Sequence, residues 1–123
     1  MKITRLHHAQ ITIPHGMEGD ARAFYCDVLG LCEVEKPGSL QGRGGFWLAV
    51  GDQQVHVGAE DGVERARTKA HLAYHVDDAS AWRAHLASRR VEIAEQAPIP
   101  GFDRFEIRDP FGNRIEFIQP LEA

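Results

Sequence analysis

The chain has 123 residues, of which 43% are hydrophobic and 26% are charged, proportions typical of one soluble globular domain with a core of its own. Its net charge is −4, and no basic stripe indicates a nucleic-acid partner. The sequence contains no apolar run long enough to cross a membrane and no pattern of a signal peptide. We therefore expect a cytoplasmic protein that binds a small-molecule substrate rather than nucleic acid or a membrane.

The first half of the chain predicts a strand, a helix and three further strands. Residues 3–13 are β-branched and roughly alternating, which is typical of a strand, and Pro14 ends it. The next segment, residues 19–29, has apolar side chains at helical spacing, with Asp20 as the candidate N-cap and Gly30 just past the end. The remaining strands are expected at residues 31–36, 44–50 and 53–59.

The second half predicts the same order of elements after a polar linker at residues 59–69. A strand at residues 70–76 leads through a helix cap at Asp77-Asp78 into a helix at residues 79–90. The sequence Asp-Pro-Phe-Gly-Asn at residues 109–113 predicts a tight turn, because proline presets φ while glycine and asparagine tolerate positive φ. Three more strands are expected at residues 91–95, 102–108 and 113–119.

Each half is thus a βαβββ module that is too small to cover both faces of its own sheet. We expect an α+β fold in which module 1 (residues 3–60) and module 2 (residues 69–120) form one domain over residues 1–123. Two such modules would make a curved eight-strand sheet around a central groove, with the helices outside. The inner face, where equivalent strands converge, is the natural place for a pocket.

Histidine and glutamate residues at matched places in the two modules predict a metal site. His8 and His56 lie on the first and last strands of module 1, and His71 and Glu116 lie on the first and last strands of module 2. His8, His71 and Glu116 form a 2-His-1-carboxylate set, which leaves open positions on a divalent ion such as Zn, Ni, Mn or Fe(II). His56 is either a fourth ligand or a general base that works near neutral pH. We take His56 and Glu116 as the candidate catalytic residues.

Strand parity also predicts the wall of the pocket, because alternate residues of a strand share one face. Gln10 and Gln54 share faces with the candidate histidine ligands, and Trp47 shares its face with Ala49 on a neighbouring strand. On a later strand, Arg104 either binds a substrate carboxylate through two hydrogen bonds or belongs to a surface row of salt bridges.

Several stretches resemble one known family over about residues 4–120. They are HHAQITI, FYCDVLGL, AHLAYHVDD and DPFGNRIEFIQP, and the ending DP-x-G-N-x-I-E-F is the most specific of them. Together they resemble the vicinal oxygen chelate superfamily, which includes glyoxalase I, methylmalonyl-CoA epimerase, extradiol dioxygenases, fosfomycin-resistance enzymes and bleomycin-binding proteins. The resemblance implies a fold of paired βαβββ modules, in agreement with the pattern above.

By position in these motifs, the resemblance implies that His8, His71 and Glu116 are the metal ligands. His56 falls where glyoxalase I has glutamate and the epimerase has glutamine, a departure that argues against both identities. The resemblance thus implies a divalent-metal-dependent, glyoxalase-like isomerase or lyase whose small oxygenated substrate is chelated through neighbouring oxygens. The alternatives are an Fe(II) extradiol-type dioxygenase and a non-catalytic small-molecule-binding protein. Short family members also imply a homodimer, in which each site takes its residues from one chain or from both.

Overall fold

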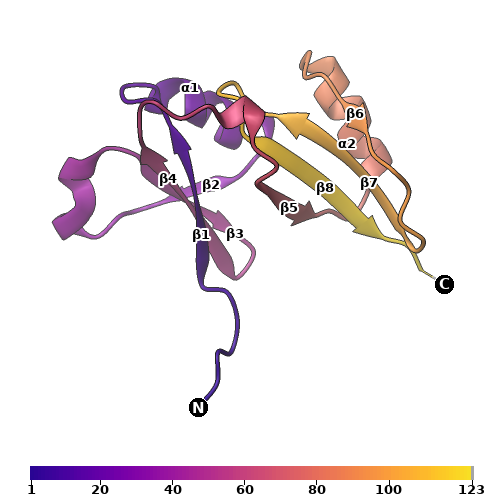
Figure 1. The fold of residues 1–123 in the computed structure, drawn as a ribbon, viewed down its shortest axis with the longest axis horizontal. Coiled ribbons are helices and arrows are strands. Elements are labelled where there is room, and N and C mark those ends of the chain that lie inside the picture. The colour runs from indigo at the N-terminus through magenta and orange to yellow at the C-terminus, as the bar shows by residue number, and fades with distance from the viewer. Residues whose placement is uncertain (123) are drawn as a thin grey trace. The chain divides into compact units, whose positions relative to one another are not determined.

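Each half of the chain folds into a βαβββ module with its own four-stranded sheet (Figure 1). The structure, a computed structural model, describes residues 1–122. The chain divides into two compact units, Met1–Val63 and a second unit that begins at Glu64, and we keep the names module 1 and module 2 for them. The predicted α+β fold of two βαβββ modules is confirmed, with the eight strands divided between two sheets. None of the helices in residues 1–122 is long and apolar enough to span a membrane.

In module 1 the strand order of the sheet is β1-β4-β3-β2. The first strand, β1, runs parallel to the last strand, β4, while β4 with β3 and β3 with β2 are antiparallel pairs. The elements in chain order are β1 (His8–Ile13), α1 (Glu18–Arg22), the π-helical η1 (Ala23–Val28), β2 (Cys32–Val34), the 3-10 helix η2 (Gly38–Arg43), β3 (Phe46–Val50) and β4 (Gln53–Ala59).

Module 2 repeats this arrangement, with strand order β5-β8-β7-β6. Again the first strand, β5, runs parallel to the last strand, β8, and the other pairs are antiparallel. The elements are the 3-10 helix η3 (Arg65–Arg67), β5 (His71–His75), α2 (Ala79–Ser88), β6 (Ala94–Glu95), β7 (Phe102–Arg108) and β8 (Arg114–Pro120).

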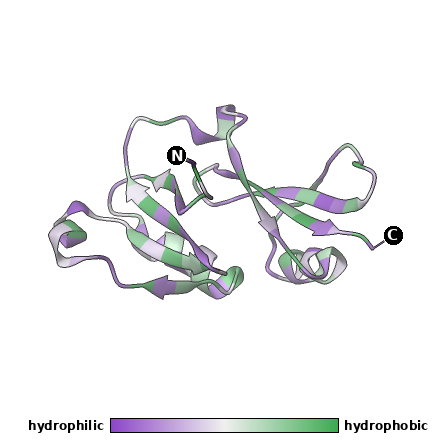
Figure 2. Cartoon of the chain, turned by 90° about the horizontal axis from the view of Figure 1, so that it is seen from below, coloured by the Kyte–Doolittle hydropathy of each residue, from purple (hydrophilic) through white to green (hydrophobic). Residues whose placement is uncertain are grey.

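Alternation along the strands gives each sheet one apolar and one polar face, and Figure 2 shows hydrophobic and hydrophilic positions interleaved along the strands. The apolar face and the buried side of a helix form the core of each module. Complete burial of one large apolar side chain stabilises the fold by about 1.5–3 kcal/mol. The most deeply buried large side chains are Ile13, Tyr25, Phe46, Leu48 and Val57 in module 1 and Leu86 and Phe105 in module 2. The polar faces are left for the candidate site.

The first strand is shorter than its sequence pattern predicts. The pattern predicts a strand over residues 3–13, whereas β1 begins at His8 and residues 1–7 have no regular secondary structure. The register pairs His8 with Gln54, and the partner strand β4 begins only one residue earlier, at Gln53, directly after its turn. The strand β4 therefore offers no backbone partners to residues before His7. Ile3 and Leu6 consequently remain exposed, at 98% and 70%.

The first predicted helix has two parts, α1 and the π-helical η1. Its N-cap is Met17 rather than Asp20, which lies in the first turn, and no side chain caps it. The backbone amide of Leu29 donates to the carbonyl of Phe24 at 2.9 Å, a π-type hydrogen bond across five residues. The wider turn lets Phe24 and its neighbour Tyr25 both face the core, which is why regular α-helical spacing fails here.

The second helix begins where the sequence predicts, because Asp78 caps it. The Asp78 side chain accepts a hydrogen bond from the backbone amide of Ala81 at 3.0 Å. The helix ends at Ser88, two residues before the predicted end, and β6 is reduced to two residues. Within the predicted polar linker, Arg65 of η3 is buried, at only 6% exposed.

The predicted turn at residues 109–113 is held together by one buried carboxylate. Asp109 is 5% exposed, and its side chain accepts hydrogen bonds from the backbone amides of Phe111 at 2.9 Å and Asn113 at 2.8 Å. Gly112 has a φ of +99°, and a Cβ atom there would lie 2.9 Å from the backbone nitrogen of Ala66. The motif at residues 109–113, the most specific part of the sequence, therefore has a structural role: it forms the turn that fixes where β8 begins.

We predict that Gly112→Ala lowers the free energy of unfolding by about 2–4 kcal/mol, because the change combines positive φ with a backbone collision. The matched control is Gly101→Ala, also in module 2, where φ is +87° but nothing lies within 4 Å of the added Cβ. That variant should lose only about 1 kcal/mol. Urea denaturation followed by circular dichroism measures both, and equal losses would contradict the close contact with Ala66.

Candidate metal-binding and substrate site

In both modules the parallel pairing of the first and last strands brings the candidate donors near each other. In module 1, His8 of β1 lies opposite the residue two positions before His56 of β4. In module 2, His71 of β5 lies opposite the residue two positions before Glu116 of β8. The same diagonal offset puts both members of each pair on the polar face of one sheet.

Three aromatic rings stack across the polar face of module 1. The His56 ring lies between Trp47, at a centroid distance of 3.8 Å, and His8, at 4.1 Å, with interplanar angles of 0° and 17°. The side-chain oxygen of Gln54 lies 2.9 Å from His56 Nε2. Because that amide oxygen can only accept, Nε2 carries the proton and Nδ1 keeps the lone pair. Two stacked neighbours and one hydrogen bond therefore hold the His56 ring with one basic nitrogen left.

The environment of His56 favours its neutral form. Burial lowers the pKa of the His56 imidazole below its ordinary value, and the nearby imidazoles of His8 and His7 lower it further. His56 is 6% exposed, whereas His8 at the start of β1 is exposed. A lowered pKa keeps His56 neutral near pH 7, in the form that accepts a proton or binds a metal.

The donor pair of module 2 is in direct contact. His71 Nε2 lies 3.3 Å from Glu116 Oε1, and His71 Nδ1 lies 3.0 Å from the backbone oxygen of Lys69. The Lys69 carbonyl accepts the Nδ1 proton, a common support for a metal-binding imidazole. Nε2 then faces the carboxylate as a second acceptor, so either a proton or a cation between the two atoms is needed to offset their repulsion.

Glu116 is shared with Arg104. Arg104 Nη1 lies 3.3 Å from Glu116 Oε1, and Nη2 donates to the backbone oxygen of Ala97 at 2.8 Å. Arg114 pairs with Glu106 beside them. Arg104 thus belongs to a row of salt bridges on the polar face, which was one of its two predicted roles. Its Nε is buried and has no hydrogen-bond partner among the described residues.

The donors suit a divalent ion in chemistry and, in module 2, in spacing. Within residues 1–122, the structure gathers no group of three or more His, Cys, Asp or Glu side chains that could hold a metal ion. The four predicted ligands lie as two pairs, one in each module, and their union in one site stays a prediction. If one ion were bound by both His71 Nε2 and Glu116 Oε1 at ordinary bond lengths, the angle between the two bonds at the ion would be about 100°. Tetrahedral and octahedral coordination both allow this angle. His8 and His56 add two imidazoles, and mixed imidazole and carboxylate donors suit Zn, Ni, Mn and Fe(II).

A cavity of about 560 Å³ opens beside the aromatic stack of module 1. Of the predicted pocket residues, Gln10 and Trp47 line it, together with His8 and His56. Gln54 does not line this cavity, and instead it orients the His56 ring. Arg104 lies in the other module.

The sequence patterns missed a second wall of this cavity, which comes from the segment between β2 and β3. Lys36, Leu40, Arg43 and Gly44 all line the cavity from this segment, which contains η2. The segment has no helical or strand periodicity, so pattern analysis passes over it. The available signal was the pair of cations, Lys36 and Arg43, at either end of a glycine-containing stretch.

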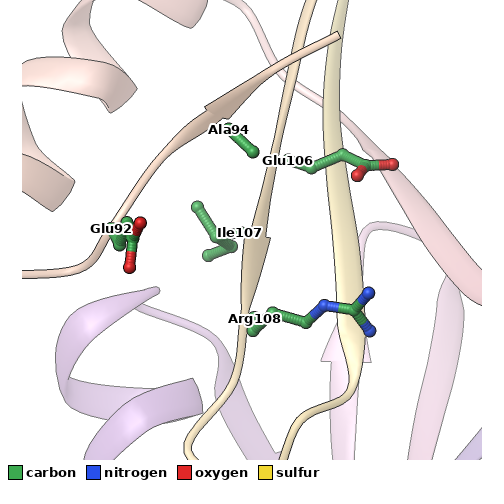
Figure 3. Close-up of a pocket in the computed structure, with 5 residues that line it drawn as sticks. All are labelled: Glu92, Ala94, Glu106, Ile107 and Arg108. Atoms are coloured by element: carbon green, nitrogen blue, oxygen red, sulfur yellow. The ribbon is translucent and has the colours of Figure 1, made fainter. Parts of the chain in front are cut away.

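Module 2 has a hollow of its own, of about 460 Å³, at the edge of β7 where β6 begins. Figure 3 shows Glu106 and Arg108 leaving β7 on the side opposite Ile107. Both charges already have partners within the module, since Glu106 pairs with Arg114 and Arg108 donates to the backbone oxygen of Gly112 at 2.9 Å. Because both charged side chains are paired within their own module, they are not free to bind a substrate. The module 1 cavity is therefore the better candidate for the substrate site.

Comparison with known families now identifies the chain. Residues 5–117 match the model of the Glyoxalase/Bleomycin resistance protein/Dioxygenase superfamily. The chain belongs to this superfamily. All four candidate donors lie inside the matched residues.

Solved structures of superfamily members agree with this assignment. A protein from Bacillus anthracis described as a member of the glyoxalase family is 37% identical, with 98% of each chain covered and a TM-score of 0.91. The fold is shared with lactoylglutathione lyase from Agrobacterium tumefaciens (21% identity, 96% and 95% covered, TM-score 0.74). It is also shared with TnmS3, an antibiotic binding protein from Streptomyces sp. CB03234 (22% identity, 97% and 99% covered, TM-score 0.74). Comparison with curated proteins gave no match.

We predict that His56 titrates below pH 6.5 in metal-free protein and that His8→Gln raises its pKa, because one of the charges that disfavour protonation is removed. A group with a lowered folded-state pKa contributes stability that is present above its unfolded pKa. That contribution is lost as the pH falls through the folded pKa. Wild-type module 1 should therefore lose more stability than the His8→Gln variant on acidification below pH 6.5.

NMR titration of the imidazole carbon protons, with His56→Gln to assign the resonance, measures this pKa directly. A His56 pKa at or above 6.5 in the wild type would contradict the buried, stacked environment described here.

Proposed function

We propose that this superfamily member is a divalent-metal-dependent, glyoxalase-like isomerase or lyase acting on a small oxygenated substrate. The observation that carries the proposal is the His71–Glu116 pair. A backbone carbonyl holds the far nitrogen of His71, and the near nitrogen faces a carboxylate oxygen at 3.3 Å. The two acceptors come from the neighbouring strands β5 and β8, with Glu116 buried and His71 exposed, and such a pair of acceptors is an arrangement expected of metal ligands.

In this proposal His8, His71 and Glu116 are the metal ligands. A divalent ion bound there supplies Lewis acidity toward a substrate with two neighbouring oxygens. Arg104 orients the Glu116 carboxylate through its 3.3 Å contact. The Lys69 carbonyl selects the His71 tautomer whose Nε2 can bind.

His56 is proposed as the proton acceptor, with a role as fourth ligand as the alternative. Its Nε2 is engaged by Gln54, while Nδ1 keeps a lone pair, and its lowered pKa leaves the ring neutral near pH 7. Stacking between Trp47 and His8 limits rotation of the ring, so the basic nitrogen stays in one direction. A positioned neutral imidazole of this kind typically contributes 10²–10⁴-fold as a general base.

We predict that protein purified without chelators contains close to one divalent ion per chain and that His71→Ala and Glu116→Gln lose it, because each removes one ligand. The matched control is His75→Ala, an exposed histidine on the same face of the same strand. That variant should keep its metal. Elemental analysis by mass spectrometry is the measurement, with circular dichroism to confirm that each variant folds.

The result also separates the kinds of chemistry. Zn, Ni or Mn would favour the isomerase or lyase, whereas iron together with oxygen uptake on a panel of catechols would favour an extradiol-type dioxygenase. Metal retained in His71→Ala would contradict the proposed ligand set.

The proposal includes a homodimer, and one experiment decides whether each site uses one chain or two. A mixture of His8→Ala and Glu116→Ala chains regains one intact site only if His8 of one chain acts with Glu116 of the other. If both residues act within one chain, the mixture stays empty of metal. Light scattering of the wild-type protein tests the dimer itself.

Sequestration of a small molecule without catalysis is the second candidate function. The observation that favours it is the module 1 cavity of about 560 Å³ beside an aromatic stack, a size and lining suited to holding a ligand. This function would replace the proposed one if the protein binds no divalent ion even after incubation with Zn, Ni, Mn and Fe(II).

A further inference from the structure

The walls of the module 1 cavity carry charge of one sign. Lys36 and Arg43 line it, and among the lining residues in the described part of the chain none is aspartate or glutamate. The chain as a whole has a net charge of −4, so this concentration of positive charge runs against its composition. A cavity whose only lysine, arginine, aspartate or glutamate lining residues are cations attracts anions and repels cations.

Lys36 is held in place by the backbone of its own segment. The Lys36 ammonium donates to the backbone oxygen of Gly44 at 2.8 Å, which ties the start of the segment to its end. The Gln41 side chain donates to the backbone oxygen of Lys36 at 3.2 Å. These hydrogen bonds close the segment on itself around η2, and the ammonium of Lys36 has two further protons to donate.

The position where this segment joins the sheet requires a glycine, Gly45. Gly45 has a φ of +78°, and a Cβ atom there would lie 2.0 Å from the backbone oxygen of Val57 in β4. Only glycine can make this approach, so the segment returns to the sheet directly beside His56. Arg43, two residues earlier, is exposed and makes no hydrogen bond or ion pair among the described residues that would compete for a ligand.

We infer that the module 1 cavity binds the oxyanion group of a substrate, a carboxylate or a phosphonate, between Lys36 and Arg43, with a compact apolar body beside Leu40 and Trp47. The inference rests on the proposed function and names its substrate class as an anion. Lys36 and Arg43 form charge-assisted hydrogen bonds to the oxyanion, and Gln10 offers a neutral amide donor on the same wall. Leu40 and Trp47 supply the apolar contact.

The test uses the full chain and three probes of similar shape: benzoate, phenylphosphonate and the neutral benzamide. Trp47 and Trp82 are the only tryptophans, so Trp82→Phe leaves Trp47 as a fluorescent reporter in the cavity wall. We predict that benzoate or phenylphosphonate changes Trp47 fluorescence with saturation, that benzamide binds at least tenfold more weakly, and that added salt weakens only the anions. The stronger of the two anions shows which oxyanion the cavity prefers.

Lys36→Met and Arg43→Gln should each weaken anion binding about tenfold, the loss expected for one charge-assisted hydrogen bond. The matched control is Arg89→Gln, an exposed arginine just after α2 that lies outside the cavity and should bind as the wild type does. Isothermal titration calorimetry of the chain with both tryptophans repeats the measurement without the reporter substitution. Equal affinity for benzamide, or no effect of Lys36→Met and Arg43→Gln, would overturn the inference.

The experiment is run on protein as purified and again after removal of metal with a chelator, because an oxyanion can also bind to a metal ion. Anion binding that survives chelation and needs Lys36 and Arg43 supports the cavity assignment. Anion binding lost on chelation but unaffected by the two substitutions overturns it and leaves the metal-dependent function intact. If the protein binds anions but never binds a metal ion, the proposed metal-dependent function is contradicted and the assignment of the cavity as an anion site is supported.

Discussion

The arrangement of the candidate site depends on the parallel pairing of the first and last strand in each module. A parallel pair cannot be joined by a short hairpin, so the helix and two further strands lie between them in the sequence. The register then sets His8 diagonally across from His56, and His71 diagonally across from Glu116. A shift of one residue in either register would move a donor to the apolar face and destroy the pair.

The two polar faces have the same backbone geometry but different chemistry. Module 1 presents stacked rings, with His56 between Trp47 and His8, whereas module 2 presents ion pairs that include Arg104 with Glu116. Burial and the nearby imidazoles of His8 and His7 lower the pKa of His56 and favour its neutral form, whereas the Glu116 carboxylate lies in an ion pair with Arg104. In the proposed function the two modules have different tasks: module 1 would accept a proton and surround a ligand, and module 2 would supply the carboxylate ligand of the metal.

Glycines connect the fold to the site at two places. Gly112 lets the turn before β8 pass close to Ala66, and so fixes the start of the strand that carries Glu116. Gly45 lets the segment after β2 touch the backbone of Val57, and so fixes the cationic wall beside His56. Both positions combine positive φ with a close backbone contact, a combination that only glycine satisfies without strain.

The sequence by itself determined the two modules and the order of strands along the chain, because alternating strands and a capped helix are local signals. The repeated histidines and Glu116 predicted four metal ligands, and that assignment stays a prediction. The sequence correctly predicted β4, β7 and the cap at Asp78, and it overestimated β1, where the end of the pattern depends on a partner strand. Only the tertiary structure decided that Gln54 orients His56, that Arg104 shares Glu116, and that Lys36 and Arg43 line the cavity. Those contacts join residues on different strands and loops, and their formation depends on register and loop closure rather than on any spacing along the chain.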